Sequence, residues 1–205
     1  MGQYYNILTY KDRKYTVYDR SIKTNQASKP EYMLAKLTEH SWIGNYTMES
    51  FSNIIYKNPM KVAWVGDYVN QIDIKDIHNP NLSLKQAYKL HEIAWNRKEK
   101  SLILKQFETS KMLLINWTKQ EYLNMQEYIE TNSIKEWCMH PLSLLTAIGN
   151  EYGGGDYYGI NKEQVGIWAF DEISFDDNNL KTTLALKGFT KRDCNFIDPW
   201  QETML

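Results

Sequence analysis

Apolar residues in this sequence come in short runs, none longer than about five residues. A helix that crosses a bilayer needs about 20 mostly apolar residues in a row, so the sequence predicts no membrane segment and no membrane partner. Residues 1–5 also lack the basic stretch and the apolar stretch of a secretory signal. Cys138 and Cys194 stand alone, without a second cysteine or a histidine at metal-ligand spacing, which favours two buried thiols in a reducing compartment. We therefore expect a cytoplasmic protein.

Short apolar runs of this kind suit strands, and helix signals occur between them. Residues 4–10 and 15–18 are rich in aromatic and β-branched residues on either side of a polar turn, which predicts a β-hairpin. Ser83 and Gln86 form a capping box, which predicts a helix over residues 84–96. Similar reasoning predicts the remaining elements: a helix capped by Thr47 that reaches residue 58, strands at 61–69, 111–117, 165–175 and 180–186, a helix opened by Thr118 and Glu121 that reaches residue 129, and a helix at 140–149 with Pro141 in its first turn. We expect one α+β domain, residues 1–205, with a mixed, mainly antiparallel sheet and packed helices.

Charge and aromatic content limit the classes of partner. The chain has 24 Lys and Arg against 25 Asp and Glu, whereas a nucleic-acid binder usually carries a basic excess and a DNA mimic a large acidic excess. Nucleic acid is therefore not expected as a partner, except through a partner complex or at the local basic patch of residues 187–192. The 15 Tyr and 7 Trp residues exceed what a core of this size needs, and they fit either a protein interface or a Tyr-rich core.

A run of three glycines marks the candidate binding loop. Three consecutive glycines destabilise helix and strand alike, so Gly153, Gly154 and Gly155 must lie in a loop. The loop lacks the Lys-Ser or Lys-Thr pair and the spaced glycines of a nucleotide-binding motif. It either turns the chain tightly or lines a site for a ligand or partner. The candidate binding residues are these three glycines together with Asn45, Asn150, Asp156 and Tyr157.

The candidate catalytic residues are two histidines and two aspartates: His40, His140, Asp67 and Asp171. A histidine beside a carboxylate can act as a general base, and these residues fall near turns or element ends, where polar side chains can share one cleft. Gly-Asn precedes a Trp-containing segment twice at similar spacing; either this is a coincidence, or it is an internal repeat that brings the two aspartates towards one edge of the sheet. Motifs of the HExxH, GxSxG and paired-cysteine types are absent, so we predict no metal and no cofactor. For each histidine, a structural role is the alternative.

Several segments resemble an uncharacterised family of small proteins found in bacteria, phages and mobile elements. That family begins MGQYY and carries an EHS-aromatic-x-GN motif, a WxGDY strand, an NxTKxEY segment, an HPLxLLT segment followed by GN, a GGGDY loop and a late VGxWAxD. The matching segments here are residues 1–5, 39–45, 64–68, 116–122, 140–150, 153–157 and 165–171. Residues 71–110, which include His78 and His91, fit the family poorly. No activity is established for the family, so the resemblance implies an accessory protein of phage or mobile-element type and assigns no catalytic residue.

Three functions remain open. The first is binding to a protein partner, such as inhibition of a host defence complex in the manner of an anti-CRISPR protein. The second is a small hydrolase or nuclease that uses the His, Asp and Asn side chains of one cleft. The third is a structural or assembly protein that associates with itself. The sequence does not decide whether the protein is an enzyme.

Overall fold

A computed structural model describes residues 2–23, 31–32, 36–69, 78–97, 99–103, 105, 107–134 and 137–197. The strands are β1 (Tyr5–Lys11), β2 (Lys14–Lys23), β3 (Glu31–Tyr32), β4 (Met60–Gly66), β5 (Glu99–Ile103), β6 (Met112–Asn116), β7 (Glu121–Asn124), β8 (Ala147–Ile148), β9 (Glu172–Asp177) and β10 (Thr190–Lys191). The helices are α1 (Tyr46–Ile55), α2 (Leu84–Asn96), α3 (Met125–Asn132), α4 (Pro141–Leu145) and α5 (Lys181–Leu186). Three short 3-10 helices add η1 (Thr109–Lys111), η2 (Lys162–Gln164) and η3 (Asn178–Leu180).

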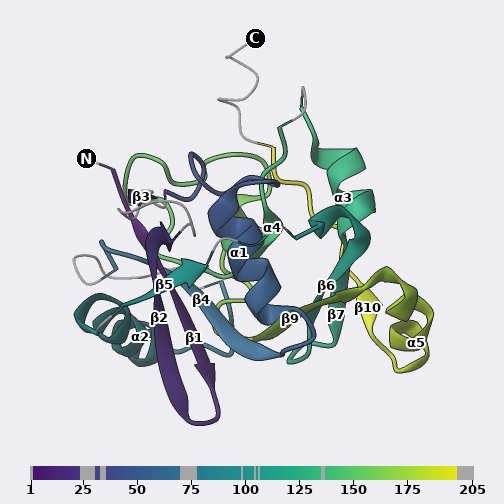
Figure 1. Ribbon diagram of the computed structural model, residues 1–205, viewed down its shortest axis with the longest axis horizontal. Coiled ribbons are helices and arrows are strands. Elements are labelled where there is room, and N and C mark those ends of the chain that lie inside the picture. Colours follow the sequence, from purple (N-terminus) through teal and green to yellow (C-terminus); the bar gives the residue numbers. More distant parts are fainter. Residues whose placement is uncertain are drawn as a thin grey trace.

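The strands join in one sheet, and the helices pack around it (Figure 1). The strand order is β10-β7-β6-β9-β4-β1-β2-β3, with β5 beside β2 and β8 beside β4. Pairs β7–β10, β2–β5 and β4–β8 are parallel, and the other pairs are antiparallel. The prediction of an α+β fold with a mixed, mainly antiparallel sheet is confirmed.

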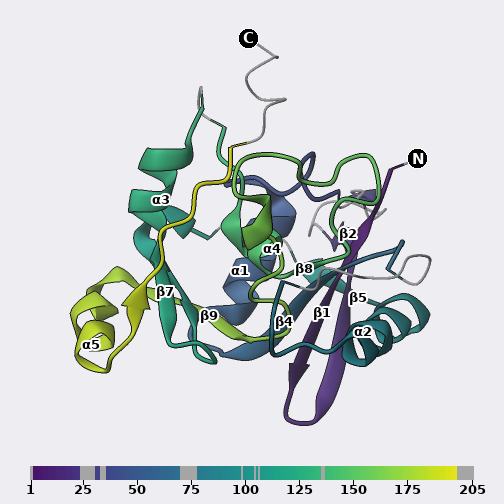
Figure 2. The ribbon, with the colours of Figure 1, turned by 180° about the vertical axis from the view of Figure 1, so that it is seen from behind.

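The sheet carries apolar side chains on both faces, because successive residues of a strand point to opposite sides. On one face, Phe51 of α1 packs against Trp64 of β4, with ring centroids 5.6 Å apart. On the other face, Leu90 of α2 belongs to the same cluster as Leu8 and Val65. Helix α1 lies in front of the sheet in Figure 1, and α2 comes forward in the view from behind (Figure 2). Trp64 and Trp168 are fully buried, as the sequence predicts.

Local capping signals identify one helix correctly and misplace two helix starts. Helix α2 begins at the predicted capping box, with both bonds between Ser83 and Gln86 present. Helix α1 is capped by Asn45, whose side chain accepts a hydrogen bond from the backbone N–H of Thr47, so the prediction of Thr47 as the cap is wrong. Helix α3 starts at Met125, after the strand β7, because Asn124 is its cap. Thr118 instead accepts a hydrogen bond from the backbone N–H of Glu172 (2.9 Å).

Two predicted strands are also corrected. The strand expected at residues 165–175 is confined to β9, because Gly166 (φ +80°) and Phe170 (φ +61°) turn the preceding chain through the left-handed region. The return strand expected at residues 180–186 is the helix α5. Its leucines alternate in sequence, yet only Leu184 is buried and Leu186 is 84% exposed. The helix predicted at residues 140–149 is α4 followed by the short strand β8.

Candidate functional site

His140 is a buried helix cap. Its Nδ1 accepts a hydrogen bond from the backbone N–H of Leu142 (3.2 Å) at the start of α4, and its ring lies 6.0 Å from that of Phe175. Burial lowers the pKa of His140 to about 3, so the ring is neutral at physiological pH. Its Nε2 has no hydrogen-bond partner in the described part of the chain. His140 therefore contacts neither of the aspartates with which it is predicted to act.

His40 is half-buried and lies beside Trp42, apart from His140. The backbone N–H of Lys36 approaches its Nδ1 at 3.4 Å, and its ring stacks against Trp42 with centroids 6.3 Å apart. Burial lowers the pKa of His40, since Glu39, which raises it, only partly offsets the loss of solvent.

The two predicted catalytic aspartates lie towards opposite ends of β4. Asp67 follows the last residue of the strand, and its Oδ1 accepts from the backbone N–H of Tyr4 (3.1 Å). The backbone carbonyl of Asp171 accepts from the N–H of Val62, near the start of the strand (3.1 Å). Five residues of strand span about 16 Å. The prediction that the repeated Gly-Asn pattern brings both aspartates to one edge is therefore wrong.

Asp171 is held in its own buried network. Its carboxylate accepts from Asn116 Nδ2 (2.9 Å) and Asn79 Nδ2 (3.2 Å), and Lys119 Nζ lies 3.4 Å away. Lys119 also donates to the carbonyl of Ile167. The four candidate catalytic residues thus belong to separate networks, and the expected shared cleft is not formed among them.

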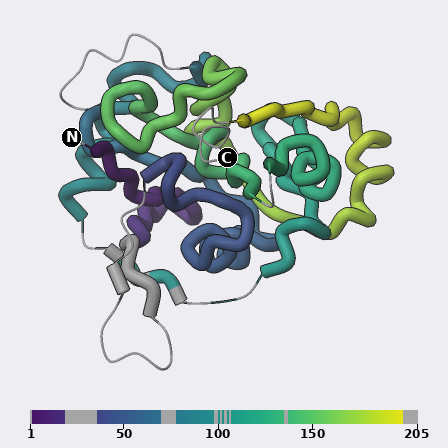
Figure 3. Tube along the Cα trace, turned by 90° about the horizontal axis from the view of Figure 1, so that it is seen from above, coloured from purple at the N-terminus to yellow at the C-terminus, as the bar shows by residue number. Residues whose placement is uncertain are grey.

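The glycine-rich loop is fastened to the first strand by Asp156. One carboxylate oxygen of this buried residue accepts from the Tyr5 hydroxyl (2.8 Å), and the other accepts from the backbone N–H groups of Tyr152 (2.8 Å) and Gly153 (2.9 Å). Burial raises the pKa of Asp156, although these hydrogen bonds act in the opposite direction. Figure 3 shows the start of β1 beside the loop. Gln3 completes the junction by donating to the carbonyl of Gly149 (2.6 Å) and, from its backbone, to that of Gly154 (3.0 Å).

The remaining candidate binding residues also shape this loop or a helix end. A Cβ on Gly153 would lie 2.6 Å from that of Gln3, which explains why the backbone approach requires glycine there. Gly155 has φ +88° beside Lys36, a conformation that favours glycine. The side chain of Asn150 bonds both backbone groups of the buried Tyr157, at 2.8 and 2.9 Å.

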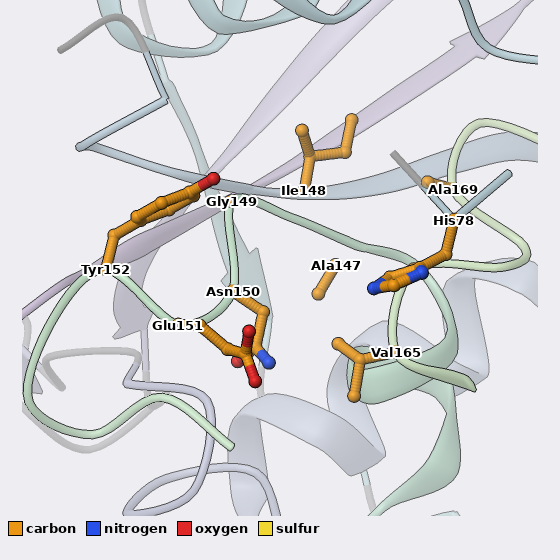
Figure 4. A pocket seen from close by; sticks show the side chains of 10 residues that line it. His78, Ala147, Ile148, Gly149, Asn150, Glu151, Tyr152, Val165 and Ala169 are labelled. Atoms are coloured by element: carbon orange, nitrogen blue, oxygen red, sulfur yellow. The ribbon is translucent and has the colours of Figure 1, made fainter. Parts of the chain in front are cut away.

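A small cavity of about 170 Å³ adjoins the loop (Figure 4). The adjacent strands β4 and β8 run parallel, and the segments that follow them contribute to its wall. His78 faces the space from one side, and Asn150 and Glu151 face it from the other, with Ala147 and Val165 between them. Of the predicted site residues, only Asn150 lines it, and the glycines of the loop, Asp156 and Tyr157 do not. His78 could not be found from sequence, because the folding of the whole sheet brings it to residues 147–152.

A second candidate surface is aromatic. Trp42 and Trp137 lie 5.1 Å apart between ring centroids, and Trp137 is 53% exposed. Two short extended segments place them, since Trp42 pairs with Met139 across an antiparallel bridge. We call His40, Trp42 and Trp137 the tryptophan surface. The aromatic excess in the sequence fits either such a surface or a Tyr-rich core, and it does not give the position of the surface.

Both cysteines are free and buried, as predicted, and burial raises each thiol pKa to about 12. In the basic patch, Lys191 pairs with Glu127 (2.5 Å) and Arg192 with Glu121 (2.6 Å). Among the residues that the structure describes, no cluster of three His, Cys, Asp or Glu side chains is placed to hold a metal ion. None of the helices in those ranges has the length and apolarity that crossing a bilayer requires.

No family model, curated protein or solved structure matches this chain.

Proposed function

We propose that this protein acts by binding a protein partner through the tryptophan surface. The observation that supports this most directly is the exposure of Trp137 next to Trp42. Tryptophan supplies a large rigid contact area, and it is enriched among the residues that dominate the energy of protein interfaces. An exposed indole ring that packs on a half-buried one offers apolar area that a partner can bury.

The hydrolase alternative has less support. His140 is buried, neutral and engaged as a helix cap, and the buried Asp171 is held by two amide donors and the Lys119 ammonium group. A general base must reach the proton that it removes. Neither side chain presents a free acceptor to a cleft shared with the other.

The resemblance to phage and mobile-element proteins suggests the kind of partner. We propose a subunit of a host defence complex, such as a CRISPR effector. Self-association through the same surface is the alternative, and the oligomeric state of the protein distinguishes it from binding to another protein.

Replacing Trp137 with serine tests the proposal. The tagged protein is purified from cells that encode it, and the protein that co-purifies is identified, produced separately and titrated against each variant. Trp137→Ser should weaken its binding at least tenfold, since a hot-spot tryptophan carries about 2 kcal/mol or more and about 1.4 kcal/mol is tenfold. Leu186→Ser is the matched control, because this leucine is 84% exposed on α5 and is not part of the tryptophan surface.

Two results would contradict the proposal. Equal affinities for the wild type, Trp137→Ser and Leu186→Ser would show that the surface does not bind the partner. If light scattering finds that the wild type is a dimer and Trp137→Ser is a monomer, the surface contacts a second copy, as an assembly protein requires. Equal thermal midpoints of the two variants would exclude unfolding as the cause.

A further inference from the structure

The cavity beside the glycine-rich loop has the position of a ligand site. It lies at the carboxyl end of β8, which pairs in parallel with β4, and His78 forms the opposite wall. Ligands of parallel sheets bind beyond this end of the strands, and the same position is open beside this local parallel pair. Its volume of about 170 Å³ is close to that of a cavity known to hold one six-membered ring. A ligand of about that size would fit.

Two titratable side chains face each other across the cavity (Figure 4). The Glu151 carboxylate pairs with Lys162 Nζ at 2.7 Å, and the side chains of Lys162 and Glu151 are 58% and 39% exposed. An exposed pair of this kind contributes little to stability, so a ligand can displace the lysine. The exposed His78 imidazole lies opposite. Asn150 takes no part, because both ends of its amide bond the backbone of Tyr157.

The backbone around the cavity is held in conformations that few side chains tolerate. Gly149 (φ +93°) and Gly166 (φ +80°) have no room for a Cβ, which would lie 2.5 Å from Val69 Cγ2 and from the Ala147 carbonyl, respectively. Glu151 has φ +75° without being glycine. This conformation is strained for glutamate, and strained residues of this kind concentrate at binding sites. Glu151 therefore places a carboxylate at the cavity at a position where glycine would be easier.

We infer that this cavity binds a small ligand with a primary amide group. The amide N–H₂ donates to Glu151, the amide carbonyl accepts from His78, and the apolar part of the ligand packs on Ala147, Val165 and Ala169. A carboxylate ligand of the same shape is disfavoured, because it would place a second negative charge beside Glu151. This site is separate from the tryptophan surface.

Benzamide and benzoate are the matched probes, since they differ only in the group that would face Glu151. Titration of the methyl signals of Ala147 and Ala169, followed by NMR, should show saturable shifts with millimolar benzamide and at least tenfold weaker binding of benzoate. Glu151→Ala and His78→Ala should each weaken benzamide binding about tenfold, the effect of losing one hydrogen bond of about 1.4 kcal/mol.

Lys162→Ala is the control variant. It breaks the same ion pair as Glu151→Ala but leaves the carboxylate in place, so it should keep or tighten benzamide binding. The inference is overturned if benzamide causes no saturable shift, if benzoate binds equally well, or if the two variants of the ion pair weaken binding alike. Trp137→Ser should bind benzamide normally, and Glu151→Ala should retain the protein partner, so the two proposals can fail independently.

Discussion

A histidine can cap a helix in a protein core only while it stays uncharged. His140 does this with its Nδ1, which takes the acceptor role that Asn45 and Asn124 fill at other helices. The sequence offered a choice between a catalytic and a structural histidine. The contacts of the ring support the structural role, and a titration can test it.

Replacing His140 with asparagine should remove a pH dependence of stability while keeping the cap. Burial lowers the pKa of His140 from 6.5 to about 3, so between these pH values the unfolded chain binds a proton at this residue and the folded chain does not. The stability from this residue is therefore complete above pH 6.5 and falls by about 1.4 kcal/mol per pH unit towards pH 3. Urea denaturation between pH 8 and pH 4 should show a shallower decline for His140→Asn than for the wild type.

His140→Ala provides the comparison. At pH 8 it should cost about 1 kcal/mol more than His140→Asn, because alanine cannot accept the bond from Leu142. An unchanged pH slope in both variants would contradict the buried neutral ring.

The two buried tryptophans should respond differently to phenylalanine. Trp168 Nε1 donates to Glu121 Oε2 (2.8 Å), whereas Trp64 Nε1 has no partner among the described residues. Trp168→Phe should therefore cost about 1–2 kcal/mol more than Trp64→Phe in the free energy of unfolding. Chemical denaturation of the two variants measures the difference, and equal costs would show that the bond to Glu121 contributes nothing.

At the scale of elements, sequence reasoning worked where the signal was local. The capping box of α2 involves residues three apart, and the hairpin of β1 and β2 needs only a short polar turn. Thr118 and Glu121 have the spacing of a capping box, but Glu121 lies in β7 and accepts hydrogen bonds from Arg192 and Trp168. Burial raises the pKa of Glu121, and these bonds lower it by more, so the side chain is ionised. Such tertiary partners cannot be read from spacing. The candidate site residues failed to converge for the same reason.

The correct cap of α3 can be checked directly. Asn124 Oδ1 accepts from the backbone N–H groups of Gln126 (3.1 Å) and Glu127 (3.3 Å). Asn124→Ala should lower the free energy of unfolding by about 1 kcal/mol, and Asn124→Asp should retain most of it. If alanine and aspartate destabilise the protein equally, the cap is not what Asn124 supplies.

For the whole molecule, the near-zero net charge predicts weak binding to duplex DNA. The basic patch of residues 187–192 should add little DNA affinity, because Lys191 and Arg192 are paired with Glu127 and Glu121. At physiological salt, we expect binding no tighter than the non-specific range of about 10⁻⁴–10⁻⁶ M. Fluorescence anisotropy with a labelled duplex measures this. Tight binding that Lys187→Glu abolishes would overturn the expectation.

The junction between Gln3 and the glycine-rich loop also sets an order of events during synthesis. Gln3 and Gly149 are 146 residues apart, so the start of β1 cannot be anchored until the loop has left the ribosome. The hairpin can pair with β4 much earlier, but the roughly 80 residues between Gly66 and Gly149 take about 4–16 s to translate. During that interval Tyr5 lacks the acceptor that Asp156 provides. The nascent chain therefore holds an unfinished sheet in which β4 still lacks its partners β8 and β9, which is the form that chaperones would meet.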